Sequence, residues 1–284
     1  MSSSGPMKTA LLLVVLLIHG TALRAGDPVV SPDLVFKDRF GGWPEIPIVS
    51  ELPSERHTPR PLGTTGADQG YYEYLPAGYD PSLSYPLMLF IHGLGENGDG
   101  GSQLDRVLSN GPPRLINNNS WDASRPFIVL SPQRSGGGCT SASQIAAFIE
   151  HAVTDYAVDE RRIYLTGLSC GAIGGWQYAG QQIDDRIAAM VPIAGNGISA
   201  FNSAGCALGA LPIWAFHGDS DGTVSPNGST VPINGLLACD SPVALDSRLT
   251  LYPGVGHNSW RDTYDLSAGH NIYRWMLMHQ KTNP

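Results

Sequence analysis

The sequence predicts an α/β fold in which a mainly parallel, twisted sheet is covered by helices on both faces. Short runs rich in β-branched and aromatic residues, such as "YPLMLFIH" at 85–92, are bounded by Gly or Pro and are typical of buried strands. Segments with apolar residues at helical spacing alternate with several of these runs. The chain has 284 residues, of which 42% are hydrophobic and 15% charged, so one large core can form.

The predicted elements follow one another from residue 71 onward. Apolar residues recur at helical spacing over 143–156, and the small residues after Ser169 lead into Trp and Tyr at helix-like spacing, so both segments predict helices. A closing helix is predicted over 264–279. The predicted strands are 71–75, 85–92, 127–131, 163–166, 188–193, 211–217 and 248–252.

The first residues of the chain differ in character from the rest. Lys8 precedes an uninterrupted apolar run over 10–18, and small residues follow near Ala25. This is the layout of a secretory signal peptide, which we place at 1–25. The apolar run is too short to span a bilayer, so we expect a secreted or periplasmic protein without a membrane anchor.

The remainder divides into an extended N-terminal segment and one α/β domain. Residues 26–67 are rich in Pro, Arg and Glu and lack periodicity, whereas residues 68–284 carry the regular pattern. Lys and Arg total 17 against 25 Asp and Glu, a formal net charge of −8, without a basic cluster. This charge balance argues against nucleic acid or an anionic membrane surface as a partner.

The four cysteines are consistent with an oxidising compartment. Cys206 and Cys239 stand in loop-like segments on either side of one predicted strand, so we expect them to form a disulfide. Cys139 and Cys170 can form a second bridge, but spacing alone does not fix the connectivity. Because no C-x-x-C pair occurs, a zinc or iron–sulfur site is not expected. We expect no other metal and no cofactor.

The segment "RIYLTGLSCGAIGGWQYAG" at 162–180 contains the pattern Gly-x-Ser-x-Gly around Ser169. The pattern is common by chance in a chain with 34 glycines, but here it stands between a predicted strand and a predicted helix. A nucleophile elbow needs this order, because the strained turn requires glycines where the backbone is crowded. This context alone leaves Ser169 as either a nucleophile or an ordinary turn serine, and a base and an acid are needed to decide.

An acid and a base stand at the ends of two later predicted strands. "LPIWAFHG" continues into "DSDGTV" with Asp221, and "RLTLYPGVG" continues into "HNSW" with His257. Since functional groups gather at the carboxyl ends of parallel strands, Ser169, Asp221 and His257 are expected to form a triad in that chain order. Asp219 is the competing candidate for the acid.

Further site residues follow from the same reasoning. We expect the backbone N–H groups of Leu94 and Cys170 to form an oxyanion hole, because one follows a strand with a glycine-rich exit and the other begins the helix after Ser169. Trp260, three residues after the expected base, is a candidate for lining the substrate cleft. Gln133 and Glu96 are candidates for the cleft rim.

Two other histidines, His92 and His217, also stand at predicted strand ends. A triad uses only one imidazole, so these two are expected to brace loops through hydrogen bonds.

The sequence resembles the secreted α/β-hydrolase esterases from about residue 71 to its end. The groups that it is most similar to are the predicted peptidase/esterase group, polyhydroxyalkanoate depolymerase-like enzymes, and feruloyl and acetyl-xylan esterases. The resemblance implies Ser169 as nucleophile, His257 as base and Asp221 as acid. At residues 170–172 the sequence differs from these groups, whose members often carry Met-Gly-Gly there. The segments that carry it are "IHGLGENG", "SPQ", "RIYLTGLSCGAIGGW", "PIWAFHGDSDGTV" and "YPGVGHNSW".

The expected function is hydrolysis of carboxylic esters through an acyl-enzyme. Only 17 residues, 194–210, separate two predicted strands, too few for a helical cap domain. The cleft should therefore be open and suit a bulky or polymeric ester such as a polysaccharide side-chain ester or a polyester, although a small soluble ester fits equally well. A serine peptidase or aminopeptidase, and a non-catalytic binding protein with the same fold, are the alternatives.

Overall fold

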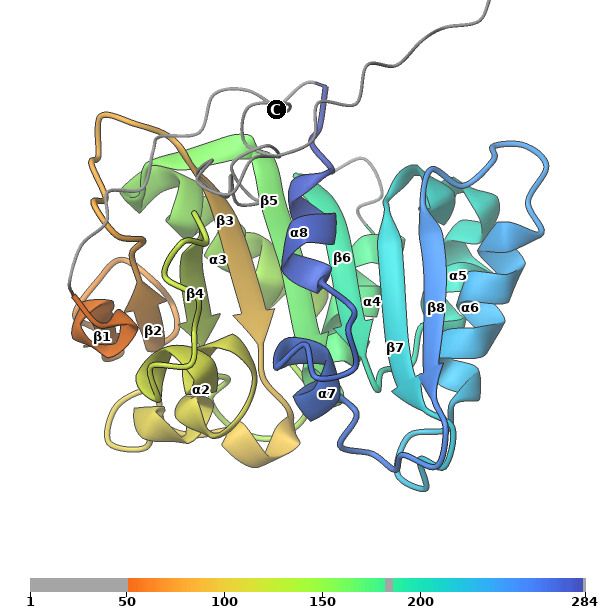
Figure 1. Ribbon diagram of the computed structural model, residues 1–284, viewed down its shortest axis with the longest axis horizontal. Coiled ribbons are helices and arrows are strands. Elements are labelled where there is room, and N and C mark those ends of the chain that lie inside the picture. The colour runs from red at the N-terminus through yellow and green to blue at the C-terminus, as the bar shows by residue number, and fades with distance from the viewer. Residues whose placement is uncertain (1–50, 182–185, 283–284) are drawn as a thin grey trace, which may run out of the picture. The chain divides into compact units, whose positions relative to one another are not determined.

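The described residues, 51–181 and 186–282 of a computed structural model, are built on one eight-stranded sheet (Figure 1). They belong to the compact unit Gly42–Pro284, and the unit Met1–Gly41 lies outside them. The strands are β1 (His57–Arg60), β2 (Tyr71–Tyr74), β3 (Tyr85–Ile91), β4 (Ile128–Pro132), β5 (Val158–Leu168), β6 (Ile187–Ile193), β7 (Ile213–Gly218) and β8 (Ser247–Tyr252).

The strand order is β1-β2-β4-β3-β5-β6-β7-β8. β2 pairs antiparallel with β1 and β4, whereas all pairs from β4 to β8 are parallel. The carboxyl ends of β3 to β8 therefore meet at one edge of the sheet. This confirms the predicted α/β class with a mainly parallel sheet.

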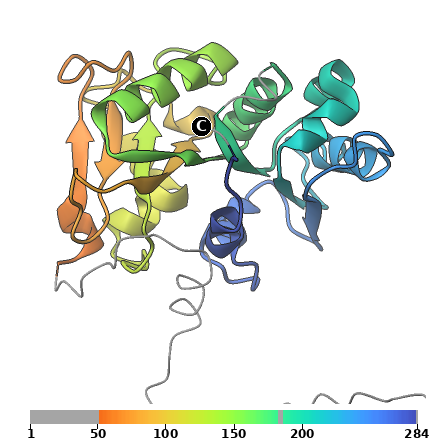
Figure 2. The ribbon, with the colours of Figure 1, turned by 90° about the horizontal axis from the view of Figure 1, so that it is seen from above.

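Helices cover both faces of this sheet, as Figure 2 shows. One face carries α3, α4, α5 and α6, and the other carries α2, α7 and α8. The helices are α2 (Gly111–Asn117), α3 (Ala142–Asp155), α4 (Cys170–Gln181), α5 (Ile198–Ala204), α6 (Asn227–Leu237), α7 (Trp260–Tyr264) and α8 (Ile272–Leu277), with 3₁₀ turns η1 (Pro53–Arg56), η2 (Leu94–Glu96), η3 (Leu104–Ser109) and η4 (Gly205–Ala210).

The central strands are buried on both faces because their sequences are apolar throughout. Every residue of β3, "YPLMLFI", and of β6, "IAAMVPI", is buried. On the face of the sheet that α3 covers, the side chains of Ile145, Phe148 and Ile149 pack into the same core. Burial of each such large apolar side chain stabilises the fold by about 1.5 to 3 kcal/mol, so the central strands form a rigid base for the loops at their ends.

The structure adds a strand within the segment 26–67, which we expected to be only extended. β1 pairs antiparallel with β2, with His57 opposite Tyr74 and Arg60 opposite Tyr71. β1 reads "HTPR" and is only partly buried, so it lacks the apolar run by which buried strands are recognised. Its Pro is tolerated because β1 lies at the edge of the sheet.

The closing helix predicted over 264–279 is instead two short helices, α7 and α8. Leu266, with φ of 58°, and Gly269, with φ of 80°, adopt the left-handed conformation between them, which an α-helix does not accommodate. The signal peptide expected at 1–25 lies outside the described residues. No helix in the described part of the chain is long and apolar enough to cross a membrane.

Residues 194–210, all of them described, contain α5 and η4 and no cap domain. α5 packs against α4 and α6, on the face of the sheet that also carries α3. It therefore does not cover the edge where the carboxyl ends of the parallel strands meet.

Candidate active site

Ser169 occupies a sharp turn between β5 and α4. Its φ is 51°, a left-handed conformation that is uncommon for a residue with a side chain. Its backbone N–H donates to the carbonyl of Ile193 at 2.8 Å, which fixes the turn to β6. A Cβ atom at Gly171 would lie 2.1 Å from the carbonyl oxygen of Ile91, and one at Gly167 would lie 2.8 Å from it. The two glycines of the motif are thus required by the close approach of β3.

The side chains of Ser169, His257 and Asp221 form a continuous hydrogen-bonded chain. His257 Nε2 lies 2.9 Å from Ser169 Oγ, and His257 Nδ1 lies 2.7 Å from Asp221 Oδ2. The Asp221 side chain is fully buried, whereas that of His257 is 22% exposed. The three residues follow β5, β7 and β8, whose parallel order brings their carboxyl ends together.

Asp221 is held as a carboxylate. Burial alone would raise its pKa, but hydrogen bonds from His257 and from the N–H groups of Thr223 and Val224 outweigh burial and lower the pKa below its ordinary value. The two N–H groups donate to Oδ1 at 2.8 and 3.0 Å. An ionised Asp221 favours the Nδ1–H tautomer of His257, which leaves Nε2 free to accept a proton from Ser169.

His217 contacts Asp221 directly, at the same carboxylate oxygen as His257. Its Nε2 lies 3.1 Å from Asp221 Oδ2 and 3.0 Å from the carbonyl of Val224. Two acceptors at this nitrogen mean that it carries the hydrogen, so Nδ1 accepts from the hydroxyl of Ser229 at 2.8 Å. We expected this histidine to brace a loop, and the loop that it braces is the one that carries the acid.

The structure shows no hydrogen bond between Asp219, the competing acid, and His257. Asp219 is exposed, and its Oδ1 accepts hydrogen bonds from Ser220 Oγ at 2.8 Å and from the N–H of Gly254 at 2.7 Å. Asp219 therefore connects the loop after β7 with the loop after β8.

The two expected oxyanion donors stand near the nucleophile. Leu94 begins η2 and Cys170 begins α4, and neither N–H donates a hydrogen bond to another described residue. A Cβ atom at Gly93 would lie 3.7 Å from the Cβ of Ser169, so the turn before Leu94 borders the serine.

His92 holds this turn in place. Its Nδ1 lies 2.6 Å from the carbonyl of Gly93, and its Nε2 accepts from the N–H of Arg134 at 2.9 Å. Burial lowers the pKa of His92, which agrees with a neutral ring that donates at one nitrogen and accepts at the other. The loops after β3 and β4 are thereby tied together beside Ser169.

Two disulfides are present, and the described residues contain no free cysteine. Cys206–Cys239, the pair that we favoured, joins the segment before β7 to the end of α6 and closes a loop that contains Asp221. Cys139–Cys170 is also present and joins the loop after β4 to the residue that follows Ser169. The second bridge therefore lies within the candidate site itself.

The three candidates for substrate contact differ in position. Trp260 is half-buried, and its ring meets the His257 ring edge-to-face with centroids 5.0 Å apart. Glu96 is only 5% exposed and accepts a hydrogen bond from Asn110. Gln133 is completely buried, and so it does not stand at the rim where we expected it.

Gln133 instead fastens neighbouring loops to one another. Its Oε1 accepts from the N–H of Gly100, and its Nε2 donates to the carbonyls of Glu96 and Gln103. The sequence reasoning missed Asn110, which donates to Glu96 and accepts from Trp260 Nε1 at 3.0 Å. No local pattern identifies Asn110, because its two partners lie far from it in the chain.

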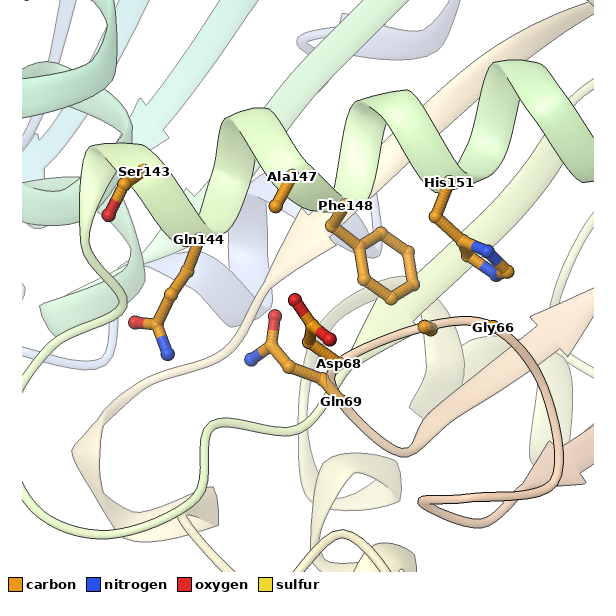
Figure 3. Close-up of a pocket in the computed structure, with 9 residues that line it drawn as sticks. Gly66, Asp68, Gln69, Ser143, Gln144, Ala147, Phe148 and His151 are labelled. Atoms are coloured by element: carbon orange, nitrogen blue, oxygen red, sulfur yellow. The ribbon is translucent and has the colours of Figure 1, made fainter.

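A separate hollow of about 260 Å³ lies between α3 and the loop before β2 (Figure 3). Asp68, Gln69 and Gln144 line it, and its lining does not include Ser169, Asp221 or His257. Among the residues that the structure describes, no group of three or more His, Cys, Asp or Glu side chains is placed to hold a metal ion.

The sequence was compared with protein families and with curated proteins. No family model matches the chain. It is 25% identical, over 55% of its length, to a bifunctional acetylxylan esterase/xylanase of Neocallimastix patriciarum, and 29% identical, over 43% of its length, to endo-1,4-beta-xylanase Y of Acetivibrio thermocellus. The alignments span only 22% and 12% of those proteins.

Solved structures of enzymes share the architecture. A thermostable esterase matches with a TM-score of 0.60 at 24% identity, covering 80% of this chain and 64% of that one. A feruloyl esterase module of Clostridium thermocellum matches at 0.51 and 20%, covering 73% and 82%. Dipeptidyl peptidase 4 of Porphyromonas gingivalis matches at 0.56 and 13%, covering 78% and 35%. The described chain has the α/β-hydrolase fold, and it is similar to esterases in sequence and structure.

Proposed function

We propose that this protein is a secreted serine hydrolase that cleaves carboxylic esters through an acyl-enzyme. The observation that carries the proposal is the chain of hydrogen bonds from Ser169 through His257 to the buried carboxylate of Asp221. Each of these three residues follows the carboxyl end of a strand, at the edge of the sheet where this fold places catalytic groups.

In the proposed reaction, His257 Nε2 takes the proton of Ser169 as its Oγ attacks the ester carbonyl. Asp221 stabilises the imidazolium that forms. His257 then gives the proton to the alcohol oxygen as the carbon–oxygen bond breaks, which leaves an acyl group on Ser169. A water molecule, deprotonated by His257, releases the acid and restores the serine.

The oxyanion of each tetrahedral intermediate is assigned to the N–H groups of Leu94 and Cys170. Both are without an acceptor in the described protein, and each begins a helical turn beside Ser169. Donors of this kind contribute about 3 to 4 kcal/mol to lowering the barrier.

The proposed substrates are bulky or polymeric esters, for which polysaccharide side-chain esters and polyesters are the classes to test. The short segment between β6 and β7, which contains no cap domain, supports an open cleft. The acetylxylan esterase/xylanase and the feruloyl esterase module to which the chain is similar point to esters of plant polysaccharides. Two disulfides support a location outside the reducing cytosol.

A phosphonate probe tests the nucleophile directly. The wild type should be labelled on Ser169, and Ser169→Ala should lose both labelling and ester hydrolysis while keeping its melting temperature within a few degrees. Ser143→Ala, which removes an exposed serine at the start of α3, is the matched control and should react as the wild type does. Retention of a tenth or more of wild-type turnover by Ser169→Ala would contradict the proposal.

A panel of matched ester and amide substrates distinguishes an esterase from a peptidase. We expect turnover of aryl, acetyl-sugar or feruloyl esters and little turnover of amides with the same acyl group. Faster cleavage of amides than of esters would favour a peptidase, a reading that the structural likeness to dipeptidyl peptidase 4 makes worth testing.

A further inference from the structure

A second pocket lies immediately beside the candidate base. Its volume is about 250 Å³, and its lining comes from the end of η3, from α2 and from the residues that follow His257. The side chains that give it its chemical character are Asn110, Arg114, Asn258, Trp260 and Arg261.

Trp260 lines this pocket and also contacts His257. Its indole ring meets the imidazole edge-to-face, with centroids 5.0 Å apart. Its Nε1 donates to Asn110, whose amide in turn donates to the buried carboxylate of Glu96. Trp260 is therefore held in place through Asn110 and Glu96, and no ligand is needed to order it.

The position of the pocket relates it to one half of an ester. In the proposed reaction, His257 Nε2 passes its proton to the leaving alcohol oxygen, so the alcohol must depart past the imidazole. The pocket adjoins this imidazole through Trp260 and Asn258. This position suits a substituent of the alcohol better than the acyl group.

The charge of the pocket is positive in a protein whose net charge is −8. Arg114 forms an ion pair with Asp265, which balances one guanidinium. Arg261 is exposed, and no carboxylate among the described residues forms an ion pair with it. No Asp or Glu lines this pocket, whereas the hollow of Figure 3 is lined by Asp68 and has no Arg.

We infer that this pocket binds an anionic substituent on the alcohol side of the ester, such as the carboxylate of an acidic sugar. The guanidinium of Arg261 supplies a charge-assisted hydrogen bond to the carboxylate. The amides of Asn110 and Asn258 and the face of Trp260 suit a hydroxyl-rich ring beside it. The inference rests on the proposed ester hydrolysis and narrows its substrate to esters whose alcohol carries a negative charge.

Two acetyl esters that differ in one group test this selectivity. In 3-acetoxybenzoate the alcohol carries a carboxylate, and in 3-acetoxybenzamide it carries a neutral amide of similar shape. The wild type should show the higher kcat/KM for the anionic ester, mainly through a lower KM, and salt should reduce this preference. Arg261→Gln should lower the ratio of the two kcat/KM values about tenfold, the effect typical of a lost charge-assisted hydrogen bond.

Arg161→Gln is the control for net charge. Arg161 lies near the beginning of β5, at the end of the strand opposite to Ser169, and forms a surface ion pair with Asp159. This variant should leave the ratio within twofold of the wild type. An equal ratio in the wild type and in Arg261→Gln, with both esters hydrolysed, would overturn the inference and leave the proposed function standing.

Binding to an inactive protein gives an arm that does not depend on turnover. In the Ser169→Ala background, Arg261→Gln should weaken binding of 3-acetoxybenzoate about tenfold and leave that of 3-acetoxybenzamide unchanged, as measured by calorimetry. Equal affinities for the anionic ester with and without Arg261 would overturn the inference. If the wild type hydrolyses neither ester, this comparison of affinities still tests the pocket, and the panel of esters described above tests the proposed function.

Discussion

His217 Nε2 and Asp221 Oδ2 lie 3.1 Å apart, and both side chains are completely buried. Asp221 Oδ2, which accepts from His257, thus has a second donor in His217. Since a buried charge needs every available hydrogen bond, His217 helps to keep Asp221 ionised and aimed at the base. In the proposed mechanism it is a positioning residue, because it would act on the reaction only through Asp221.

The first prediction compares two replacements of His217. Gln can present an N–H close to the position of Nε2, whereas Met fills the space without a donor. We expect His217→Met to lower kcat by about ten- to a hundredfold, the effect of removing a hydrogen bond to a charged group, with little change in KM. His217→Gln should keep most of kcat. If the two variants lose kcat equally while their melting temperatures match, His217 only fills space.

The second prediction separates the two aspartates of the acid loop. Asp221→Asn removes the carboxylate that fixes the tautomer of His257 and should lower kcat by about four orders of magnitude. Asp219→Asn changes a side chain that bonds to Ser220 and Gly254 and should lower kcat less than tenfold. Steady-state kinetics on one aryl ester measures both. A larger loss in Asp219→Asn would mean that the other carboxylate is the acid.

The third prediction compares the two disulfides. They close loops of similar length, with sequence separations of 31 and 33 residues, so removal of either should lower the free energy of unfolding by about 3 to 4 kcal/mol. Only Cys139–Cys170 fixes the residue that supplies a proposed oxyanion donor.

Replacement of Cys139 and Cys170 by Ala should therefore lower kcat about three- to tenfold well below the melting temperature, part of the effect of a lost donor. Replacement of Cys206 and Cys239 by Ala should leave kcat unchanged in the cold and reduce activity only near the melting temperature. Calorimetry and kinetics on the two double variants give both quantities. Equal kcat values in the cold would remove the Cys139–Cys170 bridge from the proposed mechanism.

The fourth prediction concerns acid stability. Burial lowers the pKa of His57 to about 4, against about 6.5 in an unfolded chain. The unfolded state therefore binds the proton more readily, and the free energy of unfolding falls as pH falls from about 6.5 to about 4. Between pH 7 and pH 4.5, the free energy of unfolding of His57→Gln should therefore decrease by about 2 kcal/mol less than that of the wild type. Denaturant titrations at pH 7 and pH 4.5 measure it, and identical losses in variant and wild type would contradict it.

The sequence allowed the position of the triad to be predicted because the signals are local. Gly167 and Gly171 mark the turn, and Asp221 and His257 each follow an apolar strand. Parallel pairing then brings the strand ends together without further information. The catalytic assignment remains a proposal, but the juxtaposition follows from periodicity and chain order.

The surroundings of the triad could not be predicted in the same way. Asn110 connects Glu96 with Trp260, and Trp260 is 150 residues from Asn110 in the chain. Nothing near Asn110 in the chain indicates either partner. β1 was missed because an edge strand needs only backbone pairing and not an apolar sequence. The break after Tyr264 was missed because Leu266 adopts a conformation that favours glycine.

The left-handed backbone at Ser169 places function and stability in opposition. A side chain in this conformation costs about 1 kcal/mol that Gly does not incur, so Ser169→Gly should unfold at a higher temperature than the wild type while being inactive. Selection for stability alone would thus remove the hydroxyl from this position. The hydroxyl is therefore held at this position at a cost in stability.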